Sequence, residues 1–289
     1  MRVFIVGNKG QLGQDMMIYA KKVGFDVIGK DYPDIDITKK ENICDILKEY
    51  MPKVVINCAA YTAVDDCENN IEKAYDVNAR GVKYLAEACS RINAKIVHIS
   101  TDYVFDGLKK KPYVEEDKPN PLSVYGKSKL EGERALIESY DKYFIFRVAW
   151  LYGTRGNNFL KTICNLAKKR LTTKEPLKVV NDQIGTPTYT MHVCKQIFNM
   201  INTDLFGLYH CTNEGWCSWY DFACAIVKAY SIPVNIVPCT TKEFPRPAKR
   251  PANSVLENKQ LKKLNLNIMP HWEHGLRDYL EEEKINAFL

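Results

Sequence analysis

The sequence lacks the marks of several classes of protein. Its ten cysteines include no CxxC pair and no spacing typical of a metal site, and Cys58 and Cys89 stand inside apolar segments. This placement argues against a disulfide framework and is typical of the reduced thiols of a cytoplasmic protein. No apolar run is long enough to cross a membrane, and the first ten residues, MRVFIVGNKG, predict a strand and a glycine turn rather than a signal peptide.

The sequence also has only a small excess of charge of one sign. The 289 residues include 41 Lys and Arg against 35 Asp and Glu, a formal net charge of +6. No arginine-rich stripe occurs, and the run KKK at 109–111 is typical of a solvated loop. We therefore expect neither nucleic acid nor a membrane surface as the principal partner. We expect no metal site either, because His271 and His274 of HWEH have helical spacing but no third ligand nearby.

The first half of the chain alternates short apolar runs with segments of helical periodicity. Strands are predicted at 2–7, 26–29, 53–59, 94–100 and 143–150. Between them lie helical segments such as 10–24 and 69–91, and Thr38 with Glu41 forms a capping box ahead of a further helix. Strands that alternate with helices in this way predict a parallel sheet with helices on both faces.

The pattern loosens after residue 150, where helical segments are separated by proline-bearing loops. We therefore predict an α/β fold with a doubly wound parallel sheet of the Rossmann type over residues 1–150. A smaller mixed region over residues 151–289 is expected to bind the substrate. Strands within 178–212 could rejoin the main sheet.

A glycine-rich turn follows the first predicted strand. The turn reads GNKGQLG, and its glycines are three residues apart, unlike the commonest dinucleotide fingerprint. The physical requirement is the same, however, because a tight turn lets backbone N–H groups and a helix N-terminus face a pyrophosphate. We predict dinucleotide binding here, through Gly7, Gly10, Gln11, Leu12 and Gly13.

The end of the second strand bears on the choice of dinucleotide. The carboxylate of Asp31 would accept hydrogen bonds from the adenosine ribose and disfavour a 2′-phosphate, whereas Lys30 or Lys9 would favour one. The choice between NADH and NADPH therefore stays open. Asp36 and Ile37 either lie against the adenine or form a simple capping loop.

The third predicted strand ends in the small residues of CAAYT, as a segment that passes close under a cofactor requires. Asn78, in the helical segment beyond, could hold a water or a backbone carbonyl at the site. The cofactor residues predicted in this part of the chain are Ala59, Ala60, Tyr61 and Asn78.

Three side chains are candidates for proton chemistry. Thr101 follows the strand at 94–100, at the edge where open α/β sheets place their active sites. Tyr125 stands four residues before Lys129, so the two share one helix face, although an ordinary helix start could hold the same pair. Threonine can donate to a carbonyl oxygen, tyrosine can exchange a proton, and a neighbouring ammonium lowers a phenol pKa from its usual value of about 10. The lysine could also bind the nicotinamide ribose.

Together, these residues resemble the extended short-chain dehydrogenase/reductases. Finer motifs resemble the dTDP-4-dehydrorhamnose reductase branch of that superfamily. They are STDYVFDG (100–107), PLSVYGKSKLEGE (121–133), GNNF (156–159), NDQIGTPT (181–188), GLYH (207–210) and RPANSVL (250–256). They occur in order over nearly the whole chain. The resemblance implies hydride transfer from NADH or NADPH to C4 of dTDP-4-dehydro-L-rhamnose, which yields dTDP-L-rhamnose for a polysaccharide.

The resemblance also implies roles for individual residues. Tyr125 would protonate the C4 alkoxide, Lys129 would tune Tyr125 and bind ribose, and Thr101 would polarise the carbonyl. Trp150 would line the sugar pocket, although a core role is as plausible from the sequence alone. The predicted substrate-binding residues are Val64, Ser100, Thr101, Asp102, Tyr103, Tyr125, Trp150, Arg155, Asn158, Arg250 and Asn253. We expect a small-molecule dTDP-sugar as the partner, a cytoplasmic location and, as one option, a homodimer.

Two other functions stay open. The same scaffold serves reductases, epimerases and dehydratases of other nucleotide sugars. A branch close to these reductases is a non-catalytic regulatory subunit of methionine adenosyltransferase, but the Thr101, Tyr125 and Lys129 set argues against that alternative.

Overall fold

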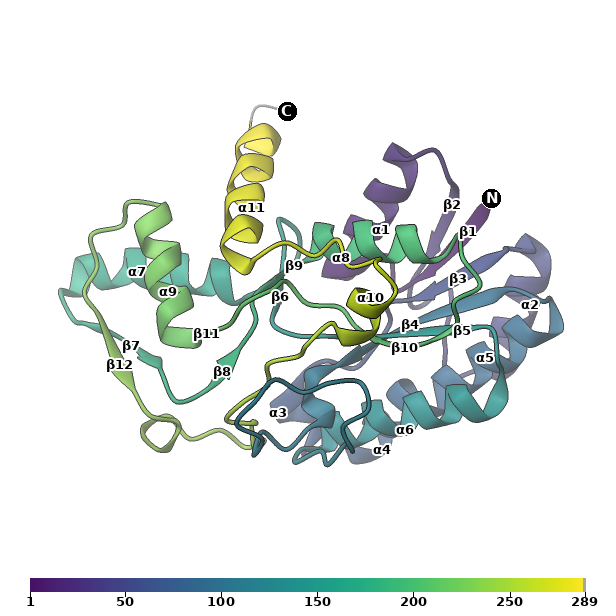
Figure 1. The fold of residues 1–289 in the computed structure, drawn as a ribbon, viewed down its shortest axis with the longest axis horizontal. Coiled ribbons are helices and arrows are strands. Elements are labelled where there is room, and N and C mark those ends of the chain that lie inside the picture. The colour runs from purple at the N-terminus through teal and green to yellow at the C-terminus, as the bar shows by residue number, and fades with distance from the viewer. Residues whose placement is uncertain (288–289) are drawn as a thin grey trace.

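Six parallel strands form the central sheet of the structure, a computed structural model that describes residues 1–287 (Figure 1). The strands are β1 (Arg2–Val6), β2 (Asp26–Lys30), β3 (Val54–Asn57), β4 (Lys95–Thr101), β5 (Tyr143–Val148) and β10 (Gly207–His210). Their spatial order is β10-β5-β4-β3-β1-β2. All four residues of β3 and four of the five in β1 are buried, as expected for strands covered on both faces.

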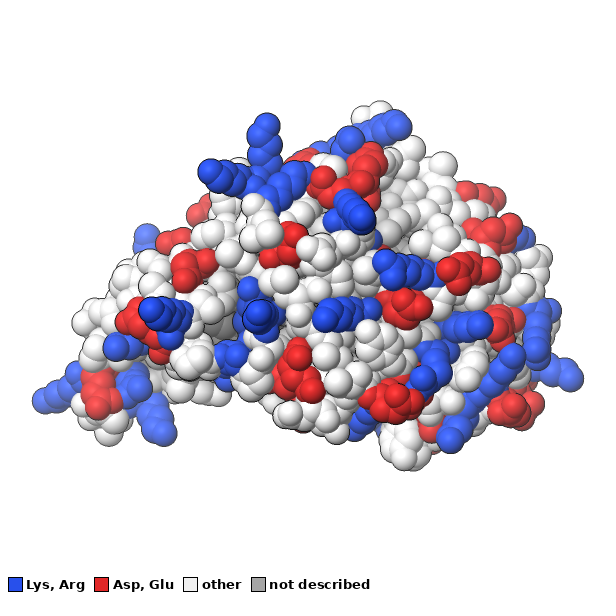
Figure 2. All heavy atoms as spheres, turned by 90° about the horizontal axis from the view of Figure 1, so that it is seen from below, with Lys and Arg blue, Asp and Glu red and all other residues white. Residues whose placement is uncertain are grey.

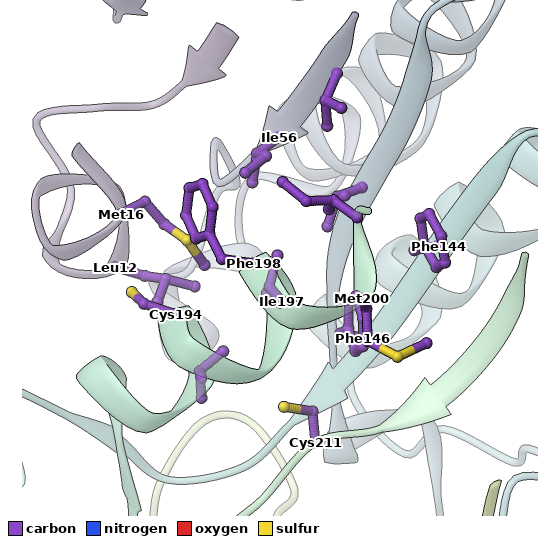
Figure 3. Packing of buried hydrophobic residues seen from close by; sticks show 14 of the residues in the cluster. Leu12, Met16, Ile56, Phe144, Phe146, Cys194, Ile197, Phe198, Met200 and Cys211 are labelled. Carbon is purple, nitrogen blue, oxygen red and sulfur yellow. The ribbon is translucent and has the colours of Figure 1, made fainter. Parts of the chain in front are cut away.

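Helices cover both faces of this sheet (Figure 1). One face carries α1 (Gln11–Lys22) and α8 (Thr190–Met200), and the other carries α2 (Lys40–Tyr50), α5 (Gly81–Arg91) and α6 (Val124–Ser139). Under α1 and α8, the side chains of Met16, Ile197 and Phe198 pack toward Ile56 and Phe146 of the sheet (Figure 3). The predicted doubly wound α/β fold is therefore confirmed.

The second half of the chain contributes to two places. Strand β10 and helix α8 join the central sheet and its cover, while other elements build a smaller core around Tyr152, Phe222 and Tyr279. The strand pairs of that part are β6 (Leu151–Tyr152) with β9 (Thr188–Tyr189), β7 (Leu177–Val180) with β12 (Ile236–Cys239), and β8 (Ile184–Gly185) with β11 (Cys217–Ser218). Its helices are α7 (Phe159–Thr173), α9 (Trp219–Ala229) and α11 (Trp272–Ala287). The division of the chain at residue 150 stays a prediction.

Short helices complete the described structure. They are α3 (Val64–Cys67), α4 (Ile71–Tyr75), the π-helical turn η1 (Asp76–Arg80), the 3₁₀ turns η2 (Asp102–Val104) and η3 (Thr241–Glu243), and α10 (Lys259–Lys263). The helical segment predicted over 69–91 is thus built from α4, η1 and α5, with a π turn in its middle.

The capping box predicted for Thr38 and Glu41 is wrong. Helix α2 begins at Lys40, and the preceding residue makes no side-chain cap. The hydroxyl and the backbone N–H of Thr38 instead donate to Asp36 Oδ1, at 2.7 and 2.9 Å. An aspartate two residues away competes for the same groups, and the local turn prevails over the cap.

The surface carries charges of both signs (Figure 2), and the cysteines form no disulfide bonds within the described residues. On the face shown in Figure 2, which is the underside of the view in Figure 1, positive and negative side chains are interspersed. Within residues 1–287, no helix has the length and apolar character needed to span a membrane. All ten cysteines are free thiols.

A buried ion pair joins helix α6 to the sheet. Arg147 of β5 donates to both carboxylate oxygens of Glu133 on α6, at 2.9 and 2.6 Å, and both side chains are at most 3% exposed. The hydroxyl of Ser100, on the neighbouring strand β4, donates to the same carboxylate. Two paired charges with an added hydrogen bond can remain ionised in the interior, whereas either charge alone would be strongly unfavourable there.

We predict that Arg147→Met lowers the free energy of unfolding by about 3–5 kcal/mol, because Glu133 is left as a buried charge without a partner. The double variant Arg147→Met/Glu133→Leu should recover part of that loss. Denaturant titration measures both. The control is Arg134→Met, which removes an exposed arginine 3.5 Å from Glu131 and should change stability by less than about 0.5 kcal/mol. Similar losses in the two single variants would contradict the prediction.

Candidate active site

Thr101 and Tyr125 meet at the carboxyl edge of the sheet. Thr101 is the last residue of β4 and is buried, and Tyr125 lies in the first turn of α6. That turn begins at this place because Ser123 caps it, with its hydroxyl accepting from the N–H of Gly126 at 3.2 Å. The phenol of Tyr125 lies beside the hydroxyl of Thr101 and makes edge-on ring contact with Tyr103, with centroids 5.7 Å apart.

The phenol of Tyr125 keeps its proton. Burial raises its pKa above the usual value, the charge of Asp102 adds to the rise, and the Thr101 hydroxyl opposes it. The lowering by Lys129 that the sequence predicts does not occur: burial is the largest influence on this pKa, and the lysine amine lies against Ile99 and His98. A phenol that holds its proton at neutral pH is in the right form for a general acid.

Lys129 is buried on the face of α6 that also carries Tyr125. Its Nζ donates to the carbonyl of Ile99 at 2.6 Å and lies 3.3 Å from His98 Nε2. Burial lowers the pKa of Lys129 to about 8, against the opposing charges of Glu133 and Cys58. The amine therefore changes charge close to working pH.

Two neighbouring polar groups have different partners. The hydroxyl of Ser100 donates a hydrogen bond to Glu133, so this side chain supports the ion pair between Glu133 and Arg147. Asp102 accepts from the Thr101 hydroxyl at 2.9 Å through Oδ1, while its buried Oδ2 has no hydrogen-bond partner among the described residues. Burial raises the pKa of Asp102 to about 6.

A cavity of about 1140 Å³ is lined by the glycine turn after β1, the segment after β2 and the segment after β3. It lies where the strand order reverses between β1 and β3, the position at which open α/β sheets bind ligands. Gly7 has φ +79°, and a Cβ there would lie 2.6 Å from the backbone nitrogen of Ala59. A Cβ at Gly13 would lie 2.0 Å from the Gly7 carbonyl oxygen. The turn thus brings bare backbone to the cavity wall, as a pyrophosphate requires.

The predicted cofactor residues divide into those that line the cavity and those that support it. Lining it are Gly7, Gly10, Asp31, Asp36, Ile37, Ala59 and Ala60, together with residues of 69–77. Leu12 is buried in the core under α1, and Gln11 starts that helix. Asn78 clamps the segment after β3: it accepts from the backbone N–H of Tyr61 at 2.8 Å and donates to its carbonyl at 3.1 Å.

The charges at the far end of the cavity are not equivalent. Asp31 accepts backbone N–H bonds from Lys9 at 2.9 Å and from Tyr32 at 2.8 Å, and it lines the cavity. Lys30 does not line it, because its Nζ lies 5.9 Å from the ring centre of Tyr50. Of the two lysines considered from the sequence, only Lys9 stays near Asp31.

Trp150 lies between β5 and β6 in a left-handed conformation, with φ +46°. Its indole stacks on Trp219 of α9, with ring centroids 3.4 Å apart and planes 7° apart. The side chain is half-buried and belongs to the junction between the sheet and the smaller core.

The segment 245–254 returns toward Thr101. Arg250 donates to both carboxylate oxygens of Asp65, at 3.1 and 3.0 Å, and to the carbonyl of Ala248 at 3.0 Å. Asp65 follows Val64, which begins α3 and is half-buried. The amide of Asn253 donates to the carbonyl of Lys109 at 2.7 Å, so it holds two loops together.

Arg155 and Asn158 lie on the other side of the glycine turn. Arg155 pairs with Asp15 of α1 at 3.0 Å and with Glu282 of α11 at 2.9 Å. Asn158 caps α7 and donates to Gln11 at 2.9 Å. Arg155 and Asn158 therefore contact helix α1, which follows the glycine turn, and not the loop that carries Arg250.

The family model described as RmlD substrate binding domain matches residues 1–285. A crystal structure from Clostridium acetobutylicum, named dTDP-4-dehydrorhamnose reductase, is 47% identical, with a TM-score of 0.95 over 98% of this chain and 100% of that one. The chain belongs to the dTDP-4-dehydrorhamnose reductase family.

Other members of the family agree. A Bacillus anthracis dTDP-4-dehydrorhamnose reductase, solved in complex with NADP, is 40% identical with a TM-score of 0.94, and the match covers 97% of this chain and 99% of that one. The Aggregatibacter actinomycetemcomitans dTDP-4-dehydrorhamnose reductase is 42% identical over 96% of this chain and 97% of its own length. The resemblance inferred from the motifs is confirmed.

Several polar residues of this family member were not predicted from the sequence as part of the site. They are Asn57, Asp65, His98, Glu133 and Arg147. Three of them interrupt apolar strands, in VVIN, KIVHIS and YFIFRV, and a polar side chain in a doubly covered strand is a signal that could have found them. Within residues 1–287, no three His, Cys, Asp or Glu side chains group as metal ligands.

We predict that Asp102 makes the stability of the folded chain fall as pH rises from about 4 to 6. The folded carboxyl keeps its proton to about pH 6, whereas an unfolded aspartate releases it near 3.8, so the folded state binds more protons in that window. Above pH 6, the buried carboxylate of Asp102 lowers the free energy of unfolding by roughly 3 kcal/mol. Asp102→Asn should therefore raise the unfolding free energy at pH 7.5 and change it little at pH 4.

The control for this measurement is Asp106→Asn. The N–H of Leu108 and neighbouring side chains hold the pKa of Asp106 below its usual value, so its contribution is present at neutral pH and lost as pH falls. This variant should lose stability at pH 7.5. A loss at pH 7.5 for Asp102→Asn as well would show that the Asp102 carboxylate is stabilised rather than strained.

Proposed function

We propose that the chain reduces the C4 keto group of dTDP-4-dehydro-L-rhamnose to give dTDP-L-rhamnose, with NADPH or NADH as the reductant. The observation that carries the proposal is that Thr101 lies beside the phenol of Tyr125, with Lys129 one turn further along the same helix, on a sheet whose glycine turn lines a cavity of about 1140 Å³. Support also comes from the full-length relatives, which are named for this activity, and from the one solved with NADP.

The residues around the cavity fit a nicotinamide dinucleotide. The glycine turn leaves room for backbone to reach a pyrophosphate, Asp31 has acceptors for ribose hydroxyls, and Ala59 and Ala60 leave space beneath the cofactor. A bound reduced nicotinamide supplies the hydride. Lys129 would hold the nicotinamide ribose.

The protein side chains manage the proton. Tyr125 donates its phenol proton to the C4 oxygen as negative charge develops there, and burial keeps that proton available until then. Thr101 orients the same oxygen through its hydroxyl. In the structure that hydroxyl donates to Asp102 at 2.9 Å, so it would have to turn toward the substrate.

Arg250 is our candidate for the substrate diphosphate. Three hydrogen bonds to Asp65 and Ala248 hold its guanidinium in place, and an arginine has five N–H donors, so donors remain for Tyr103 and for an anion. Val64 and Asn253 lie in the segments that this ion pair joins, and Trp150 would line the sugar pocket. We keep Arg155 and Asn158 as candidates near the cofactor turn rather than near the sugar.

A cytoplasmic location accompanies this proposal, and ten unpaired thiols support it. The proposed partner is the small-molecule nucleotide sugar, with neither nucleic acid nor a membrane involved. A homodimer stays a prediction.

The deciding experiment mixes the purified chain with dTDP-4-dehydro-L-rhamnose and NADPH or NADH, follows the loss of nicotinamide absorbance, and identifies the sugar formed. Production of dTDP-L-rhamnose supports the proposal. Turnover only with another nucleotide sugar would assign a different substrate. Cofactor binding without turnover of any ketosugar would favour the non-catalytic regulatory role.

We predict that Tyr125→Phe lowers kcat by about 10²-fold or more, the usual contribution of a positioned general acid. The ring and its contact with Tyr103 remain, so cofactor affinity should be unchanged in a fluorescence titration. The matched control is Tyr143→Phe, a tyrosine at the start of β5. Near-normal turnover in Tyr125→Phe would remove this residue from the mechanism.

We predict that Asp31→Ala shifts the preference between cofactors toward NADPH by about tenfold, which corresponds to ~1.4 kcal/mol. The carboxylate lines the cavity and would repel a 2′-phosphate, whereas Lys9 contacts it only through its backbone N–H. The ratio of kcat/KM for NADPH and NADH measures the shift. Because Lys30 points toward Tyr50, Lys30→Ala serves as the control and should leave the ratio alone.

A further inference from the structure

A chain of buried polar groups leads from the cofactor cavity to Lys129. Ala59 donates its backbone N–H to Asn57 Oδ1 at 3.1 Å. Asn57 Nδ2 lies 3.2 Å from His98 Nδ1, and His98 Nε2 lies 3.3 Å from Lys129 Nζ. Asn57, His98 and Lys129 are each at most 1% exposed, so no bulk solvent can repair a mismatched contact.

The first contact sets the direction of the chain. A backbone N–H can only donate, so the Asn57 oxygen must face Ala59 and its NH₂ must face His98. His98 Nδ1 therefore accepts and carries no proton. Burial and the charge of Lys129 hold the pKa of His98 well below its usual value, so the neutral ring carries its single proton on Nε2.

That proton points at the amine of Lys129. An ammonium there would set an N–H donor against an N–H donor, whereas a neutral amine offers a lone pair to His98 and an N–H to Ile99. We propose that Asn57 and His98 are positioning residues, which orient this chain so that the imidazole N–H favours the neutral form of Lys129. The inference rests on the proposed function, in which Lys129 binds the nicotinamide ribose, and it assigns that role to the charged form.

Other charges also face the amine. Glu133, one turn further along α6, favours the ammonium, but it is held by Arg147. Cys58, after β3, adds little, because burial raises the pKa of its thiol to about 12. Burial of the amine lowers the pKa of Lys129 to about 8. The N–H on His98 Nε2, which lies 3.3 Å from Lys129 Nζ, also acts against the ammonium.

The consequence is an upper limit on working pH. The pKa of Lys129 is lowered, so the ammonium is present below about pH 8 and lost above it. Ribose binding and turnover should decline over the same range. Without the His98 N–H, the ammonium should persist to higher pH, and the decline should move upward by about one pH unit.

The first test is ¹⁵N NMR of the imidazole nitrogens in the unmodified full-length chain. His98 should carry its proton on Nε2. His210 is an internal control: it is fully buried too, but its Nδ1 faces the carbonyls of Tyr113 and Glu257, each at 3.1 Å, so it should carry its proton on Nδ1. A proton on Nδ1 of His98 would overturn the proposal.

The second test compares His98→Phe with His210→Phe. The affinity for NADH, which has no 2′-phosphate to titrate, and the kcat for the ketosugar are measured from pH 6 to 10. The upper decline should move by about one pH unit in His98→Phe only. An unmoved decline in a folded His98→Phe would overturn the proposal, because a purely structural histidine would alter stability without shifting the profile.

Asn57→Asp is the second variant, used if His98→Phe does not fold. Its carboxylate can accept from both Ala59 and His98, so the NMR proton should move to Nδ1 of His98. Retention on Nε2 would contradict the orienting role of Asn57. Neither the NMR result nor NADH binding uses the sugar, so a failed ketosugar assay counts against the proposed function alone.

Discussion

The buried ion pair between Glu133 and Arg147 determines where helix α6, which carries Tyr125 and Lys129, lies against the sheet. Glu133 stands one turn after Lys129 and two turns after Tyr125, so all three share the face of α6 that meets the sheet. Arg147 on β5 and Ser100 on β4 bind the glutamate from two strands at once. Because a buried carboxylate has few alternatives to these partners, the pair fixes both the rotation and the height of the helix.

Burial then sets the protonation state of the proposed catalytic groups. It is the largest influence on Tyr125, Lys129 and Asp102, and in each case it favours the neutral form. The phenol holds its proton, the amine gives its proton up more readily, and the carboxyl stays protonated to about pH 6. A phenol that holds its proton in this way can deliver it at neutral pH.

The second half of the chain completes a site that begins in the first half. Strand β10 extends the sheet, Arg250 reaches back to Asp65, and Asn158 binds Gln11, the first residue of α1. The last two of these contacts join residues more than a hundred positions apart. A substrate bound between the two halves of the chain would contact both of them. Separate segments could then recognise its nucleotide and its sugar.

The sequence by itself determined the elements and the family. Apolar strands, the glycine turn, and Tyr125 with Lys129 on one helix face are local patterns. Such patterns predict local structure because they depend on neighbouring residues alone. The tertiary structure alone decided which side chains meet. The capping box at Thr38 lost to Asp36, Arg155 turned to Asp15 and Glu282, and Asn57, His98 and Lys129 formed a directed chain across three elements. Such outcomes depend on burial and on competition between distant partners, and no spacing along the chain encodes either.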